Sequence, residues 1–91
     1  VISPRGNKML EPEIIVYGTR WCGDCLRTRR YLEKYAVPFQ FIDIDKDKVA
    51  EGFVLTTNHG IRSVPTIVFG DGSILVEPNN LQLKEKLHLA V

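Results

Sequence analysis

The sequence has few cysteines, no long apolar run and almost no excess of charge of either sign. Apolar runs such as 14–17 and 66–69 are only four residues long. A transmembrane helix needs about 18 or more, so we expect no membrane partner. Lys and Arg number 12 against 11 for Asp and Glu. This balance lacks the basic excess on which binding to nucleic-acid phosphates depends, so we expect no nucleic-acid partner either.

The two cysteines, Cys22 and Cys25, are separated by only two residues. A secreted domain of this size that relied on disulfides would carry about four to eight cysteines. The N-terminal segment also lacks an apolar stretch of signal-peptide length, so we expect a cytoplasmic protein.

The length of 91 residues suits a single domain with a modest core. We expect residues 13–91 to form this domain as a monomer. Residues 1–12 are expected to be a disordered leader, a cloning remnant or an extension upstream of a natural start at Met9.

The apolar pattern alternates between strand-like and helix-like segments. β-branched and aromatic residues predict strands over 13–18, 39–44, 66–69 and 73–76, and the glycine-rich turn 70–72 joins the last two as an antiparallel hairpin. Helical spacing predicts helices over 23–36 and 46–57, and a last helix capped by Asn79 or Asn80. The order β-α-β-α-β-β-α predicts an α/β fold with a four-stranded mixed sheet and flanking helices.

Each predicted helix has one side that should face the sheet. In the first helix this side consists of Cys25, Thr28, Leu32, Tyr35 and Ala36. In the second helix, for which Asp45 is the expected cap, it consists of Val49, Ala50, Phe53, Val54 and Thr57. In the third helix it consists of Leu83, Leu87 and Ala90. The charged residues of the first helix, among them Arg27, are expected to form a solvated face.

The cysteine pair lies in Trp-Cys-Gly-Asp-Cys, where an apolar strand is followed by a helix. Two thiols at this spacing can close a small disulfide, and the unpaired N–H groups and partial positive charge of a helix N-terminus favour the thiolate of the first. The thiolate is the form that attacks disulfides. We therefore predict Cys22 as the nucleophile. Cys25 lies on the buried side and is predicted to resolve the mixed disulfide from inside.

Three structural interpretations of the cysteine pair are less favoured. A structural disulfide would close too short a loop to stabilise the fold much, and it would be out of place in a reducing compartment. A zinc site needs four ligands, and His59 and His88 are remote in sequence from this single pair. We expect no metal and no bound cofactor. Two merely packed cysteines are the third interpretation.

A second candidate element is Val64–Pro65, just before the third predicted strand. A proline is ordinary at the start of a strand, because it cannot donate a hydrogen bond to the sheet. A cis bond here would instead expose the N–H and C=O of Val64 to an extended substrate, which would bind as an added strand does. The spacing alone leaves both interpretations open.

Together these features resemble the glutaredoxin family of the thioredoxin fold. The resemblance covers residues 13–90, and it is closest to small redoxins of the mycoredoxin type, which similarly carry Trp-Cys-Gly-x-Cys, an Arg near Val-Pro, and Asp-Gly-Ser followed by x-Pro-x. It implies attack by Cys22, resolution by Cys25 and a cis-proline substrate platform at Val64–Pro65. It also implies a small thiol, such as glutathione or mycothiol, as the reductant.

Two departures from the family pattern affect the site. Between the cysteines, Gly-Asp replaces the usual Pro-Tyr. The Asp24 carboxylate should oppose ionisation of Cys22, and Arg20 could offset it. Alternatively, Asp24 is simply a favourable acid in the first turn of the helix.

The second departure concerns the Gly-Gly and Asp with which family members hold the glutamyl end of glutathione. Here the chain reads Val-Glu-Pro-Asn-Asn over 76–80. Glu77 would repel an anionic thiol, although Asn79, Asn80 and the N-terminus of the last helix could receive a carboxylate. Arg62 is either a cationic contact for the thiol or a solvated loop residue.

We predict a thiol-disulfide oxidoreductase that reduces protein disulfides, or mixed disulfides between proteins and small thiols. The expected substrate-binding residues are Arg20, Trp21, Arg62, Val64, Pro65, Asn79 and Asn80. Two alternatives use the same fold: a dedicated electron donor recycled by thioredoxin reductase, for an enzyme such as ribonucleotide reductase, and a carrier of an iron–sulfur cluster held between two subunits. A redox-silent adaptor is least favoured, because nothing would then explain the thiol pair.

Overall fold

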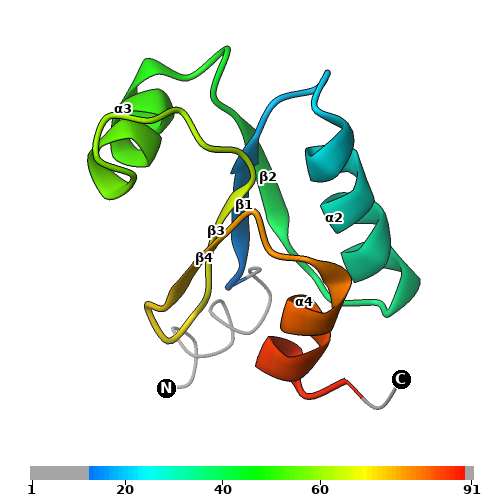
Figure 1. Cartoon of the computed structure of the whole chain (residues 1–91). Coiled ribbons are helices and arrows are strands. Elements are labelled where there is room, and N and C mark those ends of the chain that lie inside the picture. The colour runs from blue at the N-terminus through cyan, green and yellow to red at the C-terminus, as the bar shows by residue number, and fades with distance from the viewer. Residues whose placement is uncertain (1–12, 90–91) are drawn as a thin grey trace, which may run out of the picture.

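The computed structural model describes residues 13–89, so the predicted leader over 1–12 and Ala90 of the last helix lie outside the described residues. The elements follow in the predicted order (Figure 1). The strands are β1 (Ile15–Gly18), β2 (Gln40–Asp43), β3 (Thr66–Val68) and β4 (Ile74–Val76), and the helices are α2 (Gly23–Lys34), α3 (Lys48–Thr57) and α4 (Asn80–Leu87). No helix between residues 13 and 89 is long and apolar enough to cross a membrane.

The strands form one four-stranded mixed sheet in the order β2-β1-β3-β4. β1 runs parallel to β2 and antiparallel to β3, where Tyr17 lies opposite Thr66. β3 and β4 are antiparallel, and Gly72 in the turn between them has a φ of +87°, which favours glycine. The predicted mixed sheet and its closing hairpin are therefore confirmed.

The helices cover both faces of the sheet. In Figure 1, α3 lies on the left of the sheet, whereas α2 and α4 lie on the right. The larger core lies under α2 and α4 and consists of Ile14, Val16, Leu32, Ile67, Phe69 and Leu83. The smaller core, under α3, consists of Ile44, Ala50 and Val54, with Tyr17, Ile42 and Val64 packed against it. β1 therefore lies between two apolar layers, as expected for its nearly continuous apolar sequence.

Helix α3 differs from the prediction at its start and on its inner side. Asp47, not Asp45, caps the helix, because the Asp47 side chain accepts a hydrogen bond from the Ala50 N–H at 3.0 Å. The side that packs against the sheet is narrower than predicted, because only Ala50 and Val54, one turn apart, form the smaller core with Ile44. Val49 is 85% exposed and Phe53 36%, so only Ala50 and Val54 are buried as predicted.

The other two helices follow the prediction more closely. In α2, Cys25, Thr28 and Leu32 are buried as expected. Ala36 is exposed, because the helix ends at Lys34 and Ala36 has a φ of +55°. In α4, Asn79 is the cap, and Leu83 is buried.

The end of β1 meets the start of α2 at a glycine. A Cβ atom on Gly18 would lie 2.6 Å from Cys25 Sγ and 3.0 Å from Phe41 Cε1. The missing side chain therefore makes room for the buried cysteine between strand and helix. A Cβ atom on Gly52, within α3, would have no neighbour within 4 Å beyond the adjoining residues and the backbone of its own helix.

These two glycines predict alanine substitutions of opposite effect. Gly18→Ala should lower the free energy of unfolding by about 1–3 kcal/mol, because the added methyl overpacks the site. Gly52→Ala should raise it by about 0.5–1 kcal/mol, because alanine loses less backbone entropy in a helix. Urea unfolding of both variants and the wild type measures the two changes. Equal stability of the Gly18→Ala and wild-type proteins would contradict the close contact at Cys25.

Candidate active site

Cys22 stands at the boundary between the loop that follows β1 and the first turn of α2. It is the N-cap of α2, with extended backbone angles, and its Sγ accepts a hydrogen bond from the Cys25 N–H at 3.2 Å. A helix N-terminus presents such unpaired N–H groups with partial positive charge, and both favour a negative sulfur. Cys22 is also only half-buried, so solvent can reach it.

Cys25, one turn further along α2, has a different environment. Its side chain is fully buried, and neither it nor Cys22 is in a disulfide. Burial, followed by the hydrogen bond with Cys22, raises the pKa of the Cys25 thiol from an ordinary 9.0 to about 12. At neutral pH the inner sulfur is therefore a protonated thiol that lies beside the outer sulfur.

The Val64–Pro65 segment lies at the same end of the sheet as Cys22. Cys22 follows the C-terminal end of β1, Pro65 precedes the N-terminal end of β3, and the two strands are antiparallel neighbours. The Val64–Pro65 peptide bond is cis. Within residues 13–89, no hydrogen bond uses the N–H or C=O of Val64, whereas Pro65 C=O accepts from the Glu77 N–H at 2.8 Å.

Hydrogen bonds of Thr66 and Asn58 hold the loop around Val64 in place. The Thr66 hydroxyl donates to Ser63 C=O at 2.8 Å and accepts from the Asn58 side chain at 3.1 Å. Asn58 also donates to Val54 C=O at 2.9 Å, so the loop is tied to the end of α3. The Val64 backbone is therefore held in a fixed position while its own polar groups stay available.

The three predicted side chains Arg20, Trp21 and Arg62 each approach an acidic residue of the β2–α3 region, and together they form the charged rim of the site. The Trp21 indole N–H donates to Asp45 Oδ2 at 2.8 Å. Arg62 donates to the other oxygen of Asp45 and, at 2.9 Å, to Glu51. Arg20 is 74% exposed and approaches Asp43 only to 3.6 Å. Arg62 is thus paired with two carboxylates and one-third exposed, so it is not the fully solvated loop residue that was one of the two interpretations.

The predicted residues Asn79 and Asn80 have partners within the protein. Asn79 forms a reciprocal capping box with Gln82 at the start of α4, with both hydrogen bonds at 2.8 Å. The Asn80 side chain accepts a hydrogen bond from Arg27. Asn79 therefore stabilises the start of α4, and Asn80 connects α4 to α2.

Arg27 is a residue at the site whose role the sequence analysis missed. It was expected on a solvated face, but its guanidinium donates to Pro78 C=O at 2.6 Å and to Asp24 at 3.0 Å, besides Asn80. Arg27 therefore connects the first turn of α2 to the loop before α4, and it neutralises the carboxylate that lies between the two cysteines. The only sequence signal was its i,i+3 spacing from Asp24.

No metal site accompanies the cysteines in the described part of the chain. Among residues 13–89, no group of three His, Cys, Asp or Glu side chains is arranged to hold a metal ion. His59 and His88, which the zinc interpretation would have needed, are both exposed.

An outer sulfur at a helix start over a buried inner thiol, on a four-stranded mixed sheet, defines a thiol-disulfide oxidoreductase of thioredoxin-like fold. Comparison of the sequence with known protein families identifies the family. A family model described as glutaredoxin matches residues 14–74, so the chain belongs to the glutaredoxin family. The predicted fold and class of enzyme are thereby confirmed.

Individual relatives agree with this assignment. A Mycobacterium tuberculosis protein that is provisionally named as a glutaredoxin is 38% identical over 79 residues, which cover 87% of this chain and 94% of that protein. Mycoredoxin 1 of Corynebacterium glutamicum is 32% identical over 65 residues, which cover 71% and 80%. Among solved structures, the glutaredoxin of Archaeoglobus fulgidus has a TM-score of 0.68 and 31% identity, over 84% of this chain and 86% of that one.

The different environments of the two sulfurs predict selective alkylation. At pH 8, iodoacetamide should modify Cys22 alone, because Cys25 is buried and its pKa is about 12. Mass spectrometry of the intact protein should show one adduct on the wild type and none on Cys22→Ser, and both sulfurs should react in urea. A second adduct on the folded protein at pH 8 would contradict the burial of Cys25.

The same pKa predicts a loss of stability in alkali. The folded state holds the Cys25 pKa above its ordinary value, so the neutral thiol stabilises the fold fully below pH 9, and this contribution is lost as the pH rises from 9 to about 12. Urea unfolding of wild type and Cys25→Ser at pH 8 and pH 10.5 isolates the effect. The free energy of unfolding should decrease more for the wild type. An equal decrease in both proteins would contradict the raised pKa.

The contacts of Arg27 predict that its charge protects the reactivity of Cys22. Arg27→Met should slow alkylation of Cys22 roughly two- to fivefold, because Asp24 then repels the thiolate unopposed. It should also lower the melting temperature, since the contact with Pro78 is lost. Adding Asp24→Asn should restore the alkylation rate but not the melting temperature. Equally slow alkylation of the double variant would show that the charge of Asp24 does not act on Cys22.

Proposed function

We propose that this protein reduces protein disulfides, or mixed disulfides between a protein and a small thiol, in the cytoplasm. One observation carries the proposal. The Cys22 sulfur is half-exposed at the start of α2, where a backbone N–H points at it, while the Cys25 thiol is buried beside it. A reducing compartment suits this role, because both sulfurs must be free thiols at the start of each cycle.

The reaction begins with the outer sulfur. The Cys22 thiolate attacks one sulfur of the substrate disulfide, so that a Cys22–substrate disulfide forms and the other substrate sulfur leaves as a thiolate, which takes up a proton. Cys25 then loses its proton and attacks Cys22, and the second substrate thiol is released. The products are a reduced substrate and a Cys22–Cys25 disulfide. Where the substrate is a mixed disulfide, a second small thiol can release Cys22 without Cys25.

The Val64 backbone is the proposed contact for the substrate chain. Its N–H and C=O have no partner within residues 13–89, and the loop that carries them is fixed through Asn58 and Thr66. An extended segment beside the substrate cysteine could form two hydrogen bonds there, as an added strand does at a sheet edge. Trp21, 72% exposed next to Cys22, offers an apolar surface to the same segment.

A small thiol is the proposed reductant of the Cys22–Cys25 disulfide. Two molecules of the thiol would reduce it and leave as their own disulfide. The likeness to mycoredoxin 1 and to glutaredoxins supports this type of reductant. Glutathione fits less well than a neutral thiol, since the segment over 76–80 carries Glu77, while Arg62 is already paired with two carboxylates. Asn79 and Asn80 remain the proposed contacts at the start of α4.

The mechanism predicts different effects for the two cysteines. Cys22→Ser should abolish reduction of both insulin disulfides and a protein–small-thiol mixed disulfide. Cys25→Ser should lose only the dithiol reaction, since Cys22 alone suffices for the mixed disulfide. Turnover is followed with glutathione, with the neutral thiol 2-mercaptoethanol, or with NADPH and thioredoxin reductase as the electron source. Reductase activity in Cys22→Ser would refute the assignment, and turnover only with the reductase would refute the small-thiol proposal.

A further inference from the structure

Two segments far apart in the sequence flank Cys22, and one carboxylate touches both. Trp21 precedes the cysteine directly, and Arg62 lies in the loop that leads to Val64–Pro65. The Trp21 indole N–H donates to Asp45 Oδ2 at 2.8 Å, and Arg62 donates to Oδ1 of the same Asp45. Because each partner uses its own oxygen, both contacts exist at the same time.

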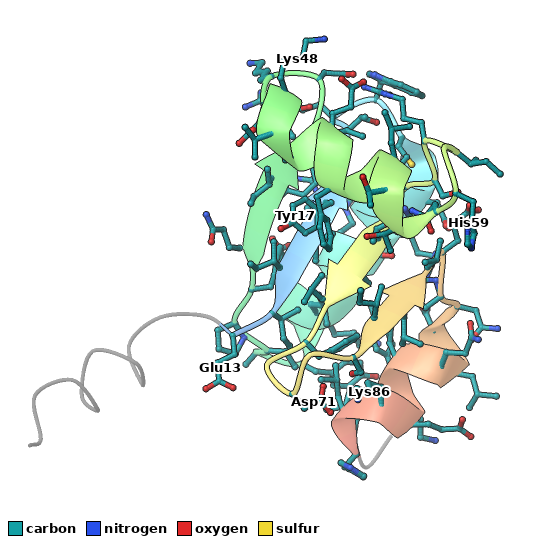
Figure 2. All side chains as sticks on the ribbon, turned by 90° about the vertical axis from the view of Figure 1, so that its left-hand side faces the viewer. Glu13, Tyr17, Lys48, His59, Asp71 and Lys86 are labelled. Carbon is teal, nitrogen blue, oxygen red and sulfur yellow. The ribbon has the colours of Figure 1, made fainter. Side chains whose placement is uncertain are left out.

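Asp45 is itself held in place by the turn between β2 and α3. Its backbone N–H donates to Asp43 Oδ1 at 2.9 Å, which fixes the turn. Arg62 has a second anchor on α3, because its Nε donates to Glu51 Oε2 at 2.9 Å. In Figure 2 this end of α3, marked by Lys48, lies at the opposite end of the molecule from Asp71 and Lys86.

The chemistry of these contacts suits a tether on an exposed surface. Hydrogen bonds from Arg62, followed by that from Trp21, lower the pKa of the Asp45 carboxyl, so it carries its charge at neutral pH. Hydrogen bonds to an ionised acceptor are the stronger kind. The Trp21 side chain is 72% exposed, so packing covers only a small part of it. The hydrogen bond to Asp45 is the one polar contact of the indole among the described residues, and it holds the N–H edge of the ring toward the turn after β2.

We propose that Asp45 is a positioning residue, which fixes the Trp21 side chain relative to the Val64–Pro65 loop and so pre-forms the site for an extended substrate segment. The proposal rests on the function proposed above. Asp45 takes no part in the sulfur chemistry. Without it, both sides of the site would have to be ordered when substrate binds, and that cost would weaken binding rather than slow the attack.

The test compares a peptide substrate with a small one. With dithiothreitol as the reductant, Asp45→Ala should raise KM for an extended peptide mixed disulfide about three- to tenfold, with kcat changed by less than about twofold. Kinetics with bis(2-hydroxyethyl) disulfide and the alkylation rate of Cys22 should not change, because neither reagent reaches both sides of the site. Asp45→Asn keeps an acceptor for the indole but loses the charge facing Arg62, so its KM should be intermediate.

Fluorescence supplies a readout that does not depend on activity. Trp21 is the only tryptophan of the chain, so its time-resolved anisotropy reports on this side chain alone. Faster local rotation is expected in Asp45→Ala, and rotation close to that of the wild type in Asp45→Asn. Asp71→Asn is the matched control, because it removes an exposed carboxylate that pairs with Lys86 at 2.9 Å at the other end of the molecule. It should change neither KM nor anisotropy.

The outcomes separate this inference from the proposed function. A wild-type protein without disulfide exchange activity would overturn the function, whatever the fluorescence of Trp21 shows. An active wild type whose Asp45→Ala variant matches Asp71→Asn in KM and in anisotropy would overturn the role of Asp45 alone. A variant that loses activity equally on the peptide and the small disulfide would show that Asp45 maintains the fold instead of positioning the site.

Discussion

The site depends on one local interaction, the hydrogen bond from the Cys25 N–H to the Cys22 sulfur where α2 begins. It can form because β1 ends at Gly18, whose missing side chain leaves space for the buried Cys25 sulfur. The same geometry gives the two sulfurs different exposure and different surroundings. One lies at the surface and faces unpaired helix N–H groups, and the other lies in an apolar interior that keeps its proton on.

An accessible sulfur cannot be surrounded by a hydrophobic core, so the structure holds the residues around it by polar contacts. On one side Asp45 connects Trp21 to Arg62, and on the other Arg27 connects the first turn of α2 to the loop before α4. Single ion pairs at a surface contribute little to stability. Their value here is geometric, because each fixes a segment of the rim relative to Cys22.

Much of the fold followed from local sequence patterns. The apolar run of β1, the glycine turn of the hairpin and the cysteine pair before a helical pattern each depend on neighbouring residues, and the structure confirms the elements they predicted. Such patterns determine which residues enter a strand or helix, because backbone sterics and burial of an apolar face act over a few residues. The prediction of Cys22 as the outer and Cys25 as the inner sulfur rested on the same kind of information.

The sequence alone thus determined the order of the elements, the family, and which of the two cysteines is exposed and which is buried. Only the tertiary structure decided which charged side chains belong to the site. Asp45 meets Trp21 across 24 positions of the chain, and Arg27 meets Asn80 across 53. Periodicity predicted Val49 to be buried, although it is 85% exposed. Such contacts depend on how helices and loops are placed around the sheet, and no spacing within one element encodes that placement.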